Sequence, residues 1–183
     1  MLMAEAIFEK KYSSVGIKGT ITFTQTHTDF VRVDINLQNV PKGIHGIHIH
    51  QRPINFKLDK SKWCDSAKAH FNGGQPLWSI DNFRGTPHGC FRLNTPRHIG
   101  DLCNNIISQR KDGIVEMVYH DNLISLIPED PNCITGKSVI IHQNRDDEGL
   151  YSSYFDMDNS LEIESKISGN AGHRIACSNI YRI

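Results

Sequence analysis

Histidines are the residues of this sequence with the clearest chemical potential. The chain of 183 residues has ten of them, and six fall between His45 and His98. His48 and His50 form an HxH pair on a predicted strand, where side chains two positions apart point to the same face. Both imidazoles can therefore reach one metal ion. His45 has the opposite parity, so we interpret it as a hydrogen-bonded structural histidine.

Further potential ligands follow along the chain. His98 and Asp101 are joined by a tight turn containing glycine, which lets an imidazole and a carboxylate converge on one ion. Neutral imidazoles with a carboxylate suit Zn²⁺, which takes four tetrahedral ligands. His142 lies on another predicted strand and could close a set with the HxH pair and His70. The same polar stretch also contains His88.

Composition restricts the classes of protein that this chain can belong to. Lys+Arg and Asp+Glu both number 20, which argues against a nucleic-acid binder with its usual basic excess. No apolar run approaches the roughly 18 to 20 residues of a membrane span. The first residues lack the pattern of a signal peptide, so a cytoplasmic location is expected. There the five cysteines would by default be reduced, and their odd number leaves at least one thiol unpaired.

The elements that position these residues are predicted to be strands. Residues 31–38 alternate apolar and polar side chains, which is the pattern of a half-buried strand. No window shows a convincing apolar period of 3.6 residues. Seven or eight short strands separated by turns indicate a β-sandwich or barrel. The other candidate strands are residues 4–10, 18–25, 43–51, 113–120, 123–127, 137–143 and 174–183.

Two long polar segments, residues 51–101 and 144–173, interrupt the strand pattern. Loops of this length inside one domain are usually functional or mobile. A linker between two domains is the alternative, but the pieces on either side would make poor independent cores. We therefore interpret residues 1–183 as a single domain with two large loops.

Five motifs, in order along the chain, resemble those of the copper/zinc superoxide dismutases. The resemblance implies an all-β fold, a Greek-key sandwich or barrel of about eight antiparallel strands related to the immunoglobulin sandwich. Residues 51–101 would be its disulfide and zinc loop, and residues 144–173 its electrostatic-type loop. The motifs are GIHGIHIH at 43–50, Cys64 followed by HFN at 70–72, RHIGDL at 97–102, VIIHQ at 139–143 with DD at 146–147, and GNAGHRIAC at 169–177.

The resemblance also implies one copper and one zinc ion per subunit, with His70 as the histidine shared between them. Asp146 would accept hydrogen bonds from ligand histidines of both metals and so fix their orientation. The implied copper ligands are His48, His50, His70 and His142. The implied zinc ligands are His70, His88, His98 and Asp101.

Three further roles follow from the same resemblance. Arg174 would guide the superoxide anion toward the copper, and Lys166 would add to its field, although the loop around Lys166 is locally acidic. Cys64 and Cys177 would form a disulfide, an exception to the rule for unexported chains. The remaining thiols, Cys90, Cys103 and Cys133, would stay free.

The activity implied is that of a superoxide dismutase, in which copper cycles between two oxidation states and His70 handles a proton. The resemblance also implies a homodimer and a copper chaperone as partners. The sequence departs from the family at His173, beside Arg174, and at Asn179 and Arg182, where relatives have apolar dimer contacts. Two alternatives are a non-catalytic protein that binds copper or its chaperone, and a β-sandwich module with structural zinc alone.

Overall fold

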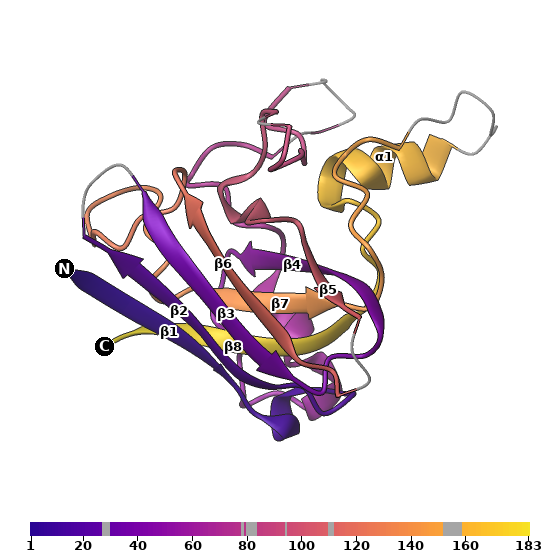
Figure 1. Cartoon of the computed structure of the whole chain (residues 1–183). Helices are drawn as coiled ribbons and strands as arrows, with labels where there is room; N and C mark the ends of the chain where they lie inside the picture. Colours follow the sequence, from indigo (N-terminus) through magenta and orange to yellow (C-terminus); the bar gives the residue numbers. More distant parts are fainter. Residues whose placement is uncertain (27–29, 78, 80–83, 94, 110–111, 152–158) are drawn as a thin grey trace.

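Eight strands form the framework of the described chain, which comprises residues 1–26, 30–77, 79, 84–93, 95–109, 112–151 and 159–183 (Figure 1). The structure is a computed structural model. Its strands are β1 (Leu2–Phe8), β2 (Lys18–Gln25), β3 (Val31–Gln38), β4 (Gly43–His50), β5 (Asn105–Ser108), β6 (Val115–Asp121), β7 (Ser138–His142) and β8 (Arg174–Arg182). The α-helix α1 spans Asn159–Ser168, and short 3-10 turns lie at Lys10–Tyr12, Lys60–Lys62, Cys64–Ala67 and Ile99–Asp101.

The strands form one sheet in the order β5-β4-β7-β8-β1-β2-β3-β6, and the neighbours pair antiparallel. The links from β3 to β4 and from β6 to β7 join strands that are not neighbours, as in a Greek key. The end strands β5 and β6 approach each other, so the sheet curls into a nearly closed barrel. The prediction of an all-β fold with about eight antiparallel strands is confirmed.

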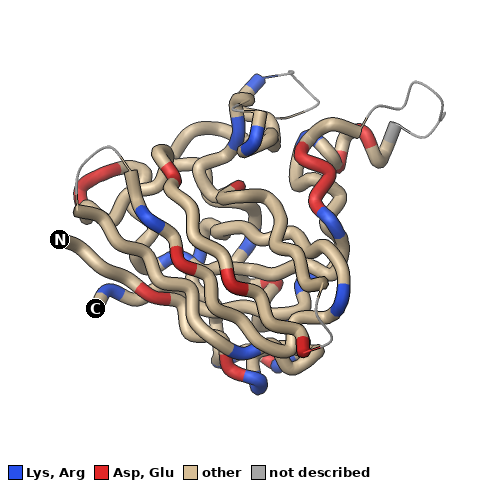
Figure 2. Tube along the Cα trace, viewed as in Figure 1, with Lys and Arg blue, Asp and Glu red and all other residues tan. Residues whose placement is uncertain are grey.

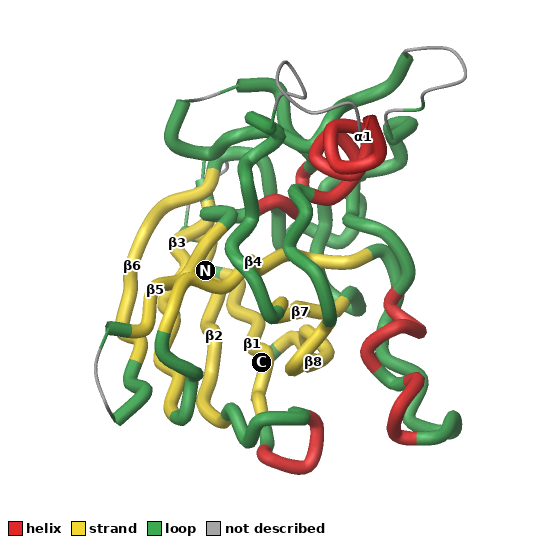
Figure 3. The backbone as a smooth tube through the Cα atoms, turned by 90° about the vertical axis from the view of Figure 1, so that its right-hand side faces the viewer, coloured by secondary structure: helices red, strands yellow, loops and turns green. Residues whose placement is uncertain are grey.

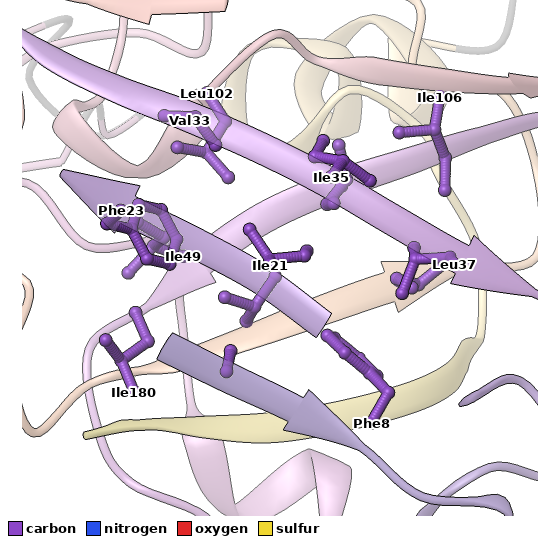
Figure 4. Close-up of a cluster of buried hydrophobic side chains, with 14 of the residues drawn as sticks. Phe8, Ile21, Phe23, Val33, Ile35, Leu37, Ile49, Leu102, Ile106 and Ile180 are labelled. Carbon is purple, nitrogen blue, oxygen red and sulfur yellow. The ribbon is translucent and has the colours of Figure 1, made fainter. Parts of the chain in front are cut away.

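Alternation along β3 provides one wall of the core. Val31, Val33, Ile35 and Leu37 are buried, whereas the residues between them are exposed or half-buried. They meet apolar side chains from strands across the barrel, and Figure 4 shows this cluster. Each fully buried side chain of this size contributes roughly 1.5 to 3 kcal/mol. The barrel is therefore a rigid support for the residues outside it.

Strand β4 is buried on both of its faces, unlike β3. Ile47 and Ile49 belong to the barrel core, whereas His48 and His50 lie on the opposite face and are also buried, at 0% and 1% exposure. Helix α1 and several loops lie over the upper end of the strands in Figures 1 and 3, and other loops lie at the lower end and beside the strands. The HxH pair is therefore enclosed between the barrel and its loops.

Helix α1 lies inside the segment 144–173, which the sequence predicted to be a loop. Among residues 160–168 of the helix, where burial is described, only Ser165 is buried, and Leu161 and Ile167 remain exposed. An exposed helix needs no continuous apolar stripe, so the periodicity gave no signal. None of the helices in the described part of the chain is long and apolar enough to span a membrane.

Two strand predictions differ from the structure. Residues 123–127 form no strand: Ser125 makes an isolated bridge to Cys133, and the Asp121 carboxylate accepts the backbone N–H of Leu123 at 2.8 Å, which favours a turn. Strand β5, which pairs Gly43 with Ser108, was not predicted. Its four residues are too few for alternation to be recognised.

The segment before His70 is fastened to the barrel. Cys64 and Cys177 form the expected disulfide, with their Cα atoms 5.6 Å apart, and the other three cysteines are free thiols. Ile54 packs with Cys177 in a small second cluster, and its backbone N–H donates to Asn179 Oδ1 at 2.6 Å. Asn179 thus bonds within the chain at the position where the family places a dimer contact.

Candidate metal centre

Three histidines from β4 and β7 are each fixed through one ring nitrogen. His50 Nδ1 donates to the Lys68 carbonyl at 2.7 Å, and His142 Nδ1 donates to the Gly172 carbonyl at 3.1 Å. His48 Nε2 donates to Asp146 Oδ2 at 2.6 Å. Because a carbonyl or carboxylate can only accept, these contacts define the tautomers and leave the second nitrogen of each ring with a free lone pair.

The free nitrogens of these rings converge with one from His70. The set of His48, His50, His70 and His142, here called the HxH set, has its ligand atoms within 4.8 Å of one another. His48 Nδ1 and the Nε2 atoms of His50, His70 and His142 are buried and have no hydrogen-bond partner among the described residues. Buried polar atoms without partners are rare and call for an explanation. A metal ion bound by all four would provide it.

A second set of ligands surrounds one oxygen of Asp101. The Nδ1 atoms of His70, His88 and His98 lie 2.9, 2.9 and 3.2 Å from Asp101 Oδ1. The backbone N–H groups of His98 and Gly89 donate to the other carboxylate oxygen and hold it in place. Three imidazoles and one carboxylate, called the Asp101 set below, match the donors that Zn²⁺ prefers.

His70 belongs to both sets because its two nitrogens point in opposite directions. Nδ1 faces Asp101 and Nε2 faces the HxH set. The residue is tied to β4 by a bridge with His50, and the backbone N–H of Phe71 donates to the Ile49 carbonyl at 2.9 Å. One imidazole can therefore link two metal ions.

Asp146 is hydrogen-bonded to one histidine of each set. Its Oδ2 accepts from His48 Nε2, and its Oδ1 accepts from His88 Nε2 at 2.8 Å. Asn104 Nδ2 adds a third side-chain donor at 3.2 Å. A Cβ at Gly169, which has a φ of +73°, would lie 2.1 Å from Asp146 Oδ1, so only glycine leaves room for this contact. Asp146 thus orients both histidines.

Burial favours the neutral form of three imidazoles of the HxH set, those of His50, His70 and His142. It lowers the pKa of His50 and His70 well below the usual range and that of His142 to about 3, and neighbouring imidazoles add to each shift. Neutral imidazole is the form that binds metal ions.

In and beside the Asp101 set, by contrast, the charged forms of several side chains are favoured. Burial opposes a charge on His88, but Asp101 and Asp146 outweigh it and raise the pKa of His88 to about 10. Burial likewise opposes ionisation of Asp101 and Asp146, but hydrogen bonds and charge from the histidines keep the pKa of both carboxyl groups well below the usual range. Two ionised carboxylates here favour a bound cation.

A cavity of about 340 Å³ leads to the HxH set. Arg174 stands in its wall, where its guanidinium donates to the carbonyl of Cys64 at 2.8 Å and to that of Lys68 at 2.6 Å. Burial lowers the pKa of Arg174 from its very high ordinary value, and the group stays cationic at neutral pH. The lining residues are His50, Ala69, His70, His142, Glu164, Ile167, Ser168, Gly172 and Arg174.

The structure does not place Lys166 among the residues that line the cavity. Its ammonium group donates to the Gly149 carbonyl, away from the cavity. The α1 positions on the cavity are instead Glu164, Ile167 and Ser168, although α1 carries charges of both signs (Figure 2). The Lys166 ammonium therefore does not contact the cavity lining, and the contribution of its charge to anion steering stays a prediction.

His45 and His173 are two of the described histidines that lie outside both sets. His45 has Nδ1 and Nε2 each 3.0 Å from a carbonyl oxygen, those of His142 and Pro41, which agrees with the structural role interpreted from its parity. The side chain of His173 is exposed, and its carbonyl accepts from the backbone N–H of Gln143.

The sequence analysis missed several residues around the centre. Glu164 and Ile167 reach the cavity only because α1 turns them toward it, and no helical signal was present to show this. Cys90, Asn105 and Glu148 form a buried hydrogen-bonded group beside Asp146. Its members are far apart along the chain, so spacing gave no indication of it.

Comparison with known proteins gives a consistent match. The profile of the copper/zinc superoxide dismutase family matches residues 17–180. The extracellular copper/zinc superoxide dismutase of Drosophila melanogaster is 34% identical over 162 residues, which is 88% of this chain and 74% of the relative. Copper/zinc superoxide dismutase 4 of Dictyostelium discoideum is 33% identical over 168 residues, 91% and 92% of the two chains. The crystal structure of the clock protein EA4 matches with a TM-score of 0.74 and 29% identity, covering 98% of this chain and 93% of that one.

Proposed function

The chain belongs to the copper/zinc superoxide dismutase family, and on this premise we propose that it is a superoxide dismutase. The reaction converts two superoxide anions and two protons into one dioxygen and one hydrogen peroxide. The observation that carries the proposal is the group of four unpartnered, buried imidazole nitrogens in the HxH set. Three of those histidines line a cavity together with a guanidinium group suited to an anion.

The two ligand sets fit the two metals of the family. The HxH set would hold copper through four neutral imidazoles, and the Asp101 set would hold zinc through three imidazoles and a carboxylate. Copper would exchange electrons with superoxide, whereas zinc, which keeps one oxidation state, would hold His70 from its other side.

His70 Nε2 is the atom we assign to proton transfer. It faces the cavity side of the centre, while Nδ1 remains directed toward Asp101. Nε2 has no hydrogen-bond partner among the described residues, so it can take up a proton when it holds no metal ion and give it up again. The acceptor would be the peroxide formed in the second half of the reaction.

Arg174 would bind the anion on its way in. Two of its N–H groups are used by the Cys64 and Lys68 carbonyls, which fix the plane of the guanidinium. A guanidinium has five N–H donors, so others remain for a superoxide oxygen. The positive charge also raises the encounter rate with an anion.

Arg174→Ala is expected to lower the dismutation rate about tenfold at low ionic strength, because a focused charge can raise association rates by about 10 to 1,000-fold. Copper and zinc contents should stay at the wild-type level, and the rate should depend less on salt. Arg182→Ala, an exposed arginine of the same strand, is the control and should retain the full rate. If Arg174→Ala keeps the wild-type dismutation rate at low salt, a group other than Arg174 guides the anion.

Glu164→Gln is expected to raise the rate about twofold at low salt. Its carboxylate lines the cavity and accepts from the Ser168 hydroxyl, so it repels an entering anion. A unit charge acting across roughly 8 Å of water contributes about 0.5 kcal/mol, which corresponds to that factor. Glu116→Gln, at an exposed position on β6, should leave the rate unchanged. A rate for Glu164→Gln equal to wild type at low salt would contradict this role.

Metal analysis combined with a dismutation assay tests the proposed function. One copper and one zinc per chain with dismutation would support it. A protein that binds both metals without dismutation would instead be a non-catalytic copper-binding relative, and zinc alone would indicate a structural zinc module. The complete HxH set and the presence of Arg174 favour the enzyme, since a non-catalytic relative has no use for both.

A further inference from the structure

A buried hydrogen-bonded link joins the two loops beside the metal centre. The Cys90 thiol donates to Glu148 Oε2 at 2.8 Å, and Asn105 Nδ2 donates to Glu148 Oε1 at 3.3 Å. The three side chains are only 1%, 9% and 4% exposed for Cys90, Glu148 and Asn105. None of them belongs to either ligand set.

The link holds Asp146 through its backbone. Asn105 Oδ1 accepts from the N–H of Asp146 at 2.9 Å, and Asn105 Nδ2 donates to its carbonyl at 3.0 Å. The N–H of Glu148 donates to Asp146 Oδ1 at 2.6 Å. Asn105 and Glu148 therefore hold Asp146 in place independently of its contacts with the histidines.

The local conformation at Glu148 supports a specific role. Its φ is +63°, a strained region that residues with a Cβ rarely adopt. A buried carboxylate is also unfavourable unless hydrogen bonds compensate for its lost hydration. The thiol and the amide provide that compensation, so both donors stabilise the carboxylate at this strained position.

We propose that Cys90 and Glu148 are positioning residues that clamp the His88 segment to the Asp146 segment and thereby tighten zinc binding. Cys90 lies two residues after His88, and Glu148 lies two residues after Asp146, so the thiol–carboxylate bond runs beside the His88–Asp146 bond. The link reduces the freedom of His88 to leave the Asp101 set. The inference rests on the zinc site of the proposed function and is independent of dismutation.

Zinc affinity of the purified full chain tests the link, measured by competition with a chromophoric chelator. Cys90→Ala removes the donor and is expected to weaken zinc binding about tenfold, the lower end of the effect seen for groups that orient metal ligands. The absorption bands of Co²⁺ bound in place of zinc should shift in the same variant. Cys90→Ser keeps a donor to Glu148 and should stay close to wild type in both measurements.

Cys133→Ala is the control, because Cys133 is also a free thiol but bridges to Ser125, outside both ligand sets and the link. It should leave the zinc affinity and the Co²⁺ spectrum unchanged. Should Cys90→Ala fail to fold, Glu148→Gln weakens the same bond and is expected to reduce zinc affinity in the same direction.

Three results would overturn the link. The first is a wild-type zinc affinity and Co²⁺ spectrum in Cys90→Ala, or in Glu148→Gln where that variant replaces it. The second is an equal loss in Cys90→Ser and Cys90→Ala, which would show that the donor is not what matters. The third is a wild-type chain that takes up no zinc, because the proposed zinc site would then not exist. Normal zinc binding without dismutation would refute the proposed enzyme and leave the link intact.

Discussion

His142→Ala protein is expected to show no dismutation above that of metal-free protein while remaining folded. His142 contributes only to the HxH set, so its loss removes one of four copper ligands and leaves the Asp101 set complete. The ring makes one hydrogen bond, to the Gly172 carbonyl, whose loss costs about 1 kcal/mol. Activity, copper and zinc contents and thermal unfolding of the same preparation measure all three expectations.

His120→Ala provides the control for this substitution. His120 lies on β6, is exposed and packs against the Phe30 ring rather than against the metal centre. It should retain full activity and both metals. Near-normal dismutation by copper-loaded His142→Ala would show that the HxH set is not the catalytic copper site.

Breaking the Cys64–Cys177 disulfide is expected to lower the free energy of unfolding more than any of the other substitutions described above. The bond joins residues separated by 113 positions, and constraining a loop of that length in the unfolded chain is worth up to about 4 to 5 kcal/mol. For a chain of this size, Cys64→Ala should lower the midpoint of thermal unfolding by roughly 10 °C or more. Calorimetry of the metal-free protein measures this without a contribution from bound metal.

The same substitution should also reduce dismutation, because the Cys64 carbonyl holds the Arg174 guanidinium. Cys133→Ala removes a free thiol elsewhere and should change neither property appreciably. Peptide mapping without reductant identifies the bond directly. Finding Cys64 as a free thiol in fully metal-loaded, active protein would show that the disulfide is not required.

The sequence alone determined the class of fold and the residue types of the centre. The alternation at residues 31–38 predicted β3 with its observed ends, and the parity of His48 and His50 placed both imidazoles on one face. The ordered motifs predicted the disulfide partners, which spacing by itself could not do. These features could be read because strand parity and motif order are properties of consecutive residues.

The directions of the groups around these ligands follow from contacts between distant segments of the chain. Pairing of β4 with β7 brings His142 beside His48, which lies 94 positions earlier in the chain. The hydrogen bonds of each ring then determine which of its nitrogens is free. The orientation of α1 places Glu164 and Ile167 on the cavity, whereas the ammonium group of Lys166 is bonded to a backbone carbonyl. The link between Cys90 and Glu148 likewise joins residues 58 positions apart. Hydrogen bonds and burial depend on partners that folding brings together from distant segments, and local periodicity contains no information about those partners.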